Sequence, residues 1–318
     1  MRKTVNTVRV EGWLYDHSLK EKVTGANSKN PNTTYLSGNV DIATDNAGLN
    51  VVTIHYTYVT PFTKSNKENP TYKTLATILA ENRSVVTVGK ENAMKLRADT
   101  SIGLNEFYSD KNNSGEKVLV SAKRNEGGFL HVVTDALNED EDKRSTWEAD
   151  TIITKVRELE ADVERNIPEK VILTGYIFDF RQALLPVDFV VYKQKARDYF
   201  MGLDASPNSP TFMKLKGQEI SQVTVRKIYE DSAFDDEPDV KEFKNTIREF
   251  VVTKANVPYA WDDEESITIA EMKEALANRA IREAEIKKNQ EEWENSRTNT
   301  TVVKAPSVAV STESSYDF

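Results

Sequence analysis

The sequence has no cysteine among its 318 residues, which excludes disulfides, thiolate metal sites and cysteine nucleophiles. No apolar run approaches the roughly 18 residues of a membrane-spanning helix. Residues 1–6 lack the apolar stretch of a secretory signal. From these absences we expect a soluble protein of the cytoplasm.

Recognisable catalytic motifs are missing as well. The three histidines, His17, His55 and His131, lie far apart in the sequence. Gly89-Lys90 lacks the upstream glycine and the following Ser or Thr of a phosphate-binding loop. Residues 110–121 begin like a calcium loop but have Ser121 where that loop needs a bidentate Glu. We therefore expect neither an enzyme nor a bound metal or cofactor.

Acidic and basic residues are unevenly distributed along the chain. The formal net charge is −9, from 42 Lys or Arg and 51 Asp or Glu. Residues 1–135 nevertheless hold 17 basic and 14 acidic side chains, and residues 171–229 hold 8 and 5. The excess acid lies in runs such as Glu139–Asp142 and in the C-terminal region. This pattern indicates either a polyanionic partner or acidic linkers that keep the protein soluble.

One residue pattern occurs twice. Val8–Asp16 and Val171–Asp179 share the order apolar, variable, apolar, variable, Gly, aromatic, aliphatic, aromatic, Asp. Alternation with a period of two predicts a strand at each place. The face that contains Gly12 is otherwise aliphatic, as in a sharply bent barrel strand. The opposite face combines aromatic rings with Arg9, so those rings form either an exposed stacking platform or a second core layer.

The order of expected elements points to small β-barrels. Strands are predicted near residues 7–17, 34–43, 50–60, 94–101 and 117–123, and a helix over Thr71–Glu81. Three strands, a helix and two strands is the order of an OB-fold, a Greek-key barrel. A second unit of the same order is predicted to follow, with its helix over Val240–Ile247.

We therefore predict a mainly β protein with minor α content, made of two OB-fold-like Greek-key barrels, a C-terminal helix and a disordered tail. The expected helix begins at a capping box of Thr268 and Glu271, and the connector between the barrels carries a helical stretch at Ile152–Val163. The predicted boundaries are barrel one at 1–135, an acidic, partly helical connector at 136–169, barrel two at 170–260, the helix at 261–297 and the tail at 298–318.

These features resemble single-stranded DNA-binding proteins, particularly the longer bacteriophage-encoded kind. The resemblance rests on two OB-like units with outward aromatics and on a Ser/Thr-containing tail that ends in Tyr316, Asp317 and Phe318. Bacterial members end in several acids and a final Pro-Phe that recruits replication and repair proteins. This tail has one adjacent acid and no proline, so the resemblance implies a partner-binding tip only through these three residues.

The resemblance implies sequence-independent binding in which bases stack on rings and Lys or Arg side chains contact phosphates. The rings expected to stack are Trp13, Tyr15 and Tyr35 in the first unit and Tyr176 and Phe178 in the second. The expected phosphate contacts are Arg9, Lys95, Arg97, Lys123, Arg124, Lys193, Lys195, Arg197, Lys214 and Lys216. Tyr56 and Tyr58 alternate with Val52 and Ile54, which favours core packing for both.

The expected function is protection of single-stranded DNA during phage replication or recombination in the host cytoplasm. RNA is an equal candidate ligand, because stacking surfaces accept both and contacts to the 2′-hydroxyl leave no motif. The alternative is a β-rich virion structural or assembly protein, in which the same aromatics are buried at subunit contacts. Nothing in the sequence sets the oligomeric state.

Overall fold

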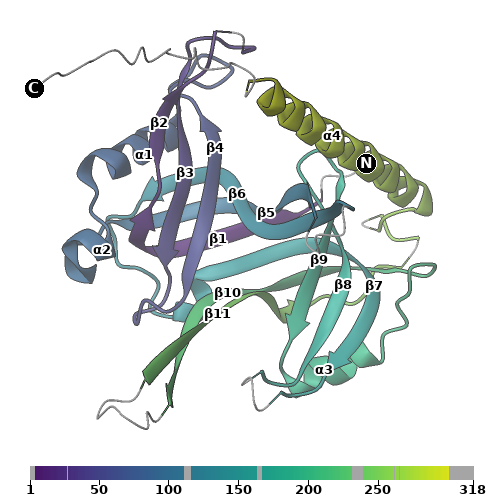
Figure 1. The fold of residues 1–318 in the computed structure, drawn as a ribbon. Coiled ribbons are helices and arrows are strands. Elements are labelled where there is room, and N and C mark those ends of the chain that lie inside the picture. The colour runs from purple at the N-terminus through teal and green to yellow at the C-terminus, as the bar shows by residue number, and fades with distance from the viewer. Residues whose placement is uncertain are drawn as a thin grey trace, which may run out of the picture. The chain divides into compact units, whose positions relative to one another are not determined.

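A computed structural model describes residues 4–26, 28–110, 116–162, 167–230, 239–260, 262–264 and 266–300 (Figure 1). The fold is mainly β, with the strands hydrogen-bonded in one continuous sheet. The chain forms two compact units, one of residues 1–105 and 122–279 and the other of residues 106–121 and 280–318. No described helix is long and apolar enough to cross a membrane.

The first barrel confirms the predicted N-terminal strands. Its strands pair in the circular order β1-β3-β4-β6-β5-β1, and β4 and β6 run parallel. This is the strand order of an OB-fold. The strands are β1 (Asn6–His17), β3 (Thr34–Ala43), β4 (Val51–Val59), β5 (Lys95–Ser109) and β6 (Val118–Val132), and β2 (Lys20–Val23) pairs with the edge of β3.

Short helices connect β4 to β5. Helix α1 (Pro70–Glu81) matches the predicted helix, with Asn69 as its N-cap and Leu75 and Ile78 buried in the core. A short helix, α2 (Val85–Val88), and a 3₁₀ turn at Lys90–Asn92 follow. The OB order of three strands, a helix and two strands is therefore confirmed in this barrel.

The inner face of β1 is the predicted one. Val8, Val10 and Leu14 are buried in the main core, with strand residues from both barrels. A Cβ atom on Gly12 would lie 2.0 Å from the backbone oxygen of Ala43 on β3. Glycine is therefore required where β1 bends against β3 to close the barrel.

A second barrel of the same strand order follows the first. Its strands pair in the order β7-β8-β9-β11-β10-β7, again with one parallel pair, β9 with β11. Its elements are β7 (Ser145–Leu159), β8 (Lys170–Phe178), β9 (Leu184–Val191), α3 (Gln194–Met201), β10 (Thr211–Glu230) and β11 (Asp239–Ala255). β1 and β7 pair antiparallel, from Asn6 with Ala149 to Val10 with Ser145, and join the two barrels.

Two predicted helices are strands. Residues 152–159 of the expected helical connector lie in β7, which pairs with β1, β8 and β10 and is buried on both faces at its centre. Residues 240–247 lie in β11, paired along their length with β10. The helix of the second barrel is instead α3, between β9 and β10. How the chain divides into domains stays a prediction.

The C-terminal helix begins where expected. α4 (Ile269–Thr300) starts at the capping box, in which Glu271 donates its backbone N–H to Thr268 Oγ1 and accepts from the Thr268 N–H at 3.0 Å. Within the compact unit of residues 106–121 and 280–318, Gln290 on α4 donates to the Tyr108 carbonyl and accepts from the Tyr108 N–H. Residues 298–300, which were predicted to begin the disordered tail, are instead the last residues of α4. The rest of that predicted tail, with the tip residues Tyr316, Asp317 and Phe318, lies outside the described residues.

Candidate nucleic-acid interface

Trp13 is half-buried and its ring is covered by two cations. Lys90 Nζ lies 4.2 Å and Arg144 Cζ 5.3 Å from the ring centroid. Arg144 is itself buried and donates to the Thr44 carbonyl and to Asn46 Oδ1. Both cations therefore occupy space over the ring that a stacked base would use.

The other predicted rings differ in exposure. Tyr15, Tyr35 and Tyr176 are half-buried, and Tyr35 contacts Tyr58 with the ring centroids 4.6 Å apart. Phe178 is corrected: it is completely buried in a core cluster with Ile152, Leu184, Phe212 and Ala275. Ile177 and Phe178 point to opposite faces of β8 and both are buried, so both faces of the strand are covered at this point. The Phe178 ring therefore has no surface open to a ligand.

Most predicted cations of the first barrel already have carboxylate or carbonyl partners. Arg9 is exposed and pairs with Asp99 at 2.7 Å, and Arg97 lies 4.0 Å from the same carboxylate. Arg124 pairs with Glu126 at 2.7 Å. Lys95 donates to the Asp135 carbonyl at 3.3 Å.

Lys123 is turned inward, where its ammonium donates to the Asp188 carbonyl at 2.8 Å and lies 5.7 Å from the Phe250 ring centroid. Burial lowers the pKa of this lysine, opposed by nearby carboxylates. Lys123 is therefore corrected from a phosphate contact to a cation of the interior.

The second barrel divides its cations between paired and open ones. Arg197 is corrected: it is buried and ion-paired with Glu169, because α3 packs this face onto the barrel. Lys214 and Lys216 share Glu148, at 3.8 and 2.9 Å. Lys193 and Lys195 are exposed at the start of α3, and neither forms an ion pair with any residue that the structure describes.

Three exposed rings line one groove that the sequence did not predict. This ring groove, about 950 Å³ in volume, is lined by residues 55–60 of β4 and the following turn, by residues 69, 71 and 99–101, by residues 124 and 126–129 of β6, and by Phe180 and Arg181. Tyr58 is 44%, Phe129 64% and Phe180 81% exposed. Exposed apolar rings that gather in one groove mark a candidate binding site.

A tight turn between β8 and β9 presents Phe180. Asp179 Oδ1 accepts from the N–H groups of Arg181 and Ala183, each at 2.8 Å, and the Asp179 N–H donates to the Ala183 carbonyl at 2.9 Å. The Arg181 guanidinium lies 5.1 Å from the Phe180 ring centroid. The turn thus holds an aromatic face and a cation together at the groove.

Phe129 follows two glycines with positive φ. Gly127 has φ +30° and Gly128 +118°, and a Cβ atom on Gly128 would lie 2.2 Å from the Asp99 carbonyl oxygen. The chain can approach β5 this closely only without a side chain, and the kink turns Phe129 outward. The Gly-Gly-Phe sequence was the available signal for this site.

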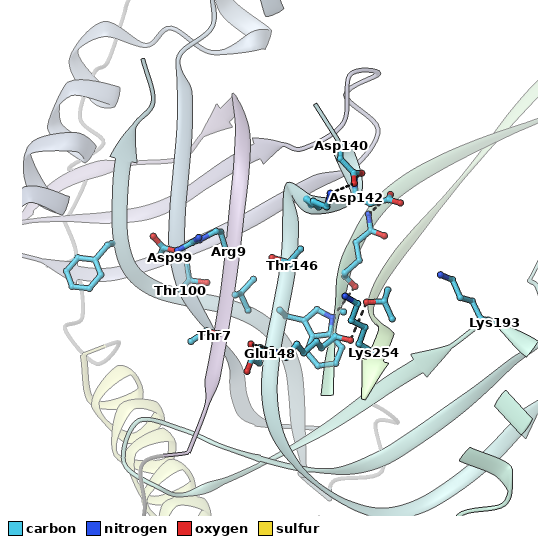
Figure 2. A pocket seen from close by; sticks show the side chains of 18 residues that line it. Thr7, Arg9, Asp99, Thr100, Asp140, Asp142, Thr146, Glu148, Lys193 and Lys254 are labelled. Carbon is cyan, nitrogen blue, oxygen red and sulfur yellow. Dashed lines mark hydrogen bonds and ion pairs between the residues drawn. The ribbon is translucent and has the colours of Figure 1, made fainter. Parts of the chain in front are cut away.

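The ring groove shares Asp99, Thr100 and Phe129 with a second groove. This lysine groove, about 830 Å³ in volume, contains the cations Arg9, Lys143, Lys193, Lys216 and Lys254 (Figure 2). Figure 2 shows Arg9 beside Asp99, with Lys193 and Lys254 farther along the groove.

The two grooves contain fewer carboxylates than cations. Several of these carboxylates form ion pairs with the cations. The linings together have seven Lys or Arg and five Asp or Glu side chains. Asp140 accepts from Lys143 at 2.9 Å, a hydrogen bond that lowers the pKa of the carboxyl. Burial and the neighbouring Arg124 lower the pKa of His55. The lining can accept an anion by exchanging surface ion pairs, each of which is worth little in water.

The grooves bring together only part of the predicted set. They contain Arg9, Arg124, Lys193 and Lys216, and none of the five predicted stacking rings. The sequence reasoning missed Phe129, Phe180, Arg181, Lys143 and Lys254, and it assigned Tyr58 to the core. Tyr56, its neighbour but one, is buried as predicted.

Fold and grooves together define a protein with two OB-type barrels whose open grooves combine exposed rings and cations. A family model matches residues 4–292, and the chain belongs to the YorF family. No curated protein matches the sequence. Among solved structures, the chain is similar to a deletion mutant of the single-stranded DNA-binding protein from Thermus aquaticus, with 10% identity, a TM-score of 0.43, and coverage of 84% of this chain and 100% of that one.

Proposed function

We propose that this protein binds single-stranded nucleic acid, with DNA as the physiological ligand, along the ring groove and the lysine groove. Bases stack on Phe129, Phe180 and Tyr58 while the backbone follows the cations. The observation that carries the proposal is the set of three exposed rings from separate segments in one groove that continues into a cationic one. Aromatic faces accept any base, so the binding is independent of sequence.

Stacking on these rings requires unpaired bases, since a duplex buries its base faces. A single strand also bends sharply enough to place bases on Phe129 and phosphates beside Arg9 in the adjoining groove. The paired carboxylates limit non-specific attraction of duplex, because a phosphate must compete with Asp99 for Arg9. The proposal involves no chemical step, so the protein acts as a binder rather than an enzyme.

The biological setting in this proposal is protection of single strands during phage replication or recombination in the host cytoplasm. Tyr316, Asp317 and Phe318 are the proposed contact for replication or recombination proteins, on the resemblance described above. Adding oligo-U to the titrations described next would show whether RNA binds with equal affinity.

The test is a fluorescence-anisotropy titration of labelled oligo-dT, with the same label on a duplex as comparison. We expect binding at about 50 mM salt, a much weaker signal with duplex, and an affinity that falls with salt by a slope of about 0.7 per neutralised phosphate. Lys254→Gln should reduce that slope by about 0.7, whereas Lys20→Gln, on the exposed strand β2 outside both grooves, should leave it unchanged.

Absence of an anisotropy change at micromolar protein and low salt contradicts the proposal, as does equal affinity for duplex. If the protein instead forms concentration-dependent assemblies that bury the rings, the virion or assembly alternative replaces it. Size-exclusion mass at several concentrations, without nucleic acid, distinguishes that outcome.

A further inference from the structure

We propose that a third groove, beside α3, is an additional base-stacking subsite for a single strand that leaves the lysine groove, an inference that rests on the proposed function. This α3 groove has a volume of about 370 Å³. It is lined by Lys195, Ala196, Tyr199 and Phe200 of α3 and by residues 252–257 at the end of β11.

The α3 groove is continuous with the lysine groove. Thr253 and Lys254 line both grooves, so the same lysine borders the two spaces. An extended strand that follows the cations of the lysine groove therefore meets the α3 groove next. Among the described residues, neither Lys195 nor Lys254 forms an ion pair, so both ammonium groups can contact phosphates without displacing a carboxylate.

Helix periodicity explains how α3 presents a ring and a cation together. Lys195 and Tyr199 are four residues apart and lie on the same helix face. Phe200, the next residue, faces the barrel and is buried, with its ring centroid 5.2 Å from that of Tyr199 in an edge-on contact. Tyr199 is therefore 47% exposed but supported from beneath, which is the arrangement of a stacking platform rather than of a mobile surface ring.

The chemistry of the lining favours nucleic acid over an apolar peptide. The lining combines small residues with two aromatic ones, and its charged residues, Lys195 and Lys254, are both cations. A strand with bases and phosphates matches one ring flanked by two ammonium groups. An apolar peptide matches the exposed Val257 equally well but gains nothing from the continuity with the lysine groove.

The experiment measures dissociation constants of oligo-dT from ~6 to ~30 nucleotides with native protein and with Tyr199→Ala. Short oligonucleotides that fill only the first two grooves should bind both proteins equally. Longer ones should bind Tyr199→Ala about 5- to 150-fold more weakly than native protein, the loss expected for one stacked base. Tyr199→Phe, which keeps the ring, should restore native affinity.

Met201→Ala is the matched control, because Met201 is on the same helix with the same 47% exposure but does not line the groove. Its affinity should equal that of native protein at every length. Equal affinities of Tyr199→Ala and native protein for the long oligonucleotides overturn the inference while leaving the proposed function intact. Equal losses at all lengths also overturn it, and lack of binding by native protein at every length refutes the proposed function itself.

Discussion

Replacing Phe180 with alanine is the sharpest single test of the ring groove. The ring is 81% exposed, so its removal deletes almost no packing within the protein. Exposed positions of this kind change the free energy of unfolding by about 0.5 kcal/mol or less. A base stacked on the ring contributes about 1–3 kcal/mol to binding, so Phe180→Ala should raise the dissociation constant about 5- to 150-fold.

The contrast between these two magnitudes makes the prediction specific. Asp179 holds the turn through backbone N–H groups and not through the ring, so the truncated turn keeps its shape. Arg181 remains in place, which confines the change to stacking.

The assay is anisotropy of labelled oligo-dT, together with urea unfolding to confirm unchanged stability. Phe62→Ala is the control, since Phe62 is 55% exposed and lies outside the ring and lysine grooves. Phe180→Trp should keep the affinity and show fluorescence quenching when oligo-dT is added. An unchanged affinity of Phe180→Ala, equal to that of Phe62→Ala, would refute the placement of bases in the ring groove.

Three further predictions concern charge, pH and packing. Asp99→Asn releases Arg9 from its ion pair and should tighten oligo-dT binding about 2- to 5-fold at low salt, measured by anisotropy, whereas weaker binding would contradict the competition argument. Burial raises the pKa of Glu219, whose oxygens both accept from Asn125, from its ordinary 4.5 to about 7. The folded state therefore binds a proton more readily than the unfolded one, and stability should fall as pH rises from about 4.5 to about 7, by up to about 3 kcal/mol. Glu219→Gln should flatten this dependence in urea unfolding, and an unaltered pH profile would show that Glu219 is not its source. A Cβ atom on Gly175 would lie 2.0 Å from a backbone oxygen of β7, so Gly175→Ala should destabilise the protein by about 2–4 kcal/mol, and a smaller loss in urea unfolding would argue against the close strand contact.

The first barrel could be predicted because its elements carry local signals. Val8, Val10 and Leu14 alternate with polar or half-buried neighbours, and Asn69 and Pro70 mark the start of α1. The strand β7 was misassigned because it is buried on both faces at its centre, which removes the alternation that identifies a strand. Helix α3 carries little local signal, because it is short and has no side-chain N-cap.

The repeated pattern misled the alignment of the two barrels. Val8–Asp16 lies in β1, the first strand of its barrel, whereas Val171–Asp179 runs along β8, the second strand of its own, and into the turn. The shared glycines, Gly12 and Gly175, each allow a neighbouring strand to approach a backbone where a Cβ atom has no space. The pattern therefore reports a common local requirement and not an equivalent position.

The exposed rings could not be found from periodicity. Alternation places Trp13 on the outer face of β1, but Lys90 and Arg144, which cover its ring, come from distant parts of the chain. Phe180 and Phe129 lie in a turn and after a glycine kink, where no period applies. Only tertiary structure shows that these two rings and Tyr58 line the same groove.

The most direct measurement is photocrosslinking of the protein to a single strand carrying iododeoxyuridine, followed by mass spectrometry of the linked peptides. Irradiation joins the modified base to the aromatic side chain on which it stacks. The account predicts links at Phe129, Phe180 and Tyr58. Links confined to Trp13 and Tyr176, with the ring groove unmodified in a protein that binds the strand, would contradict it.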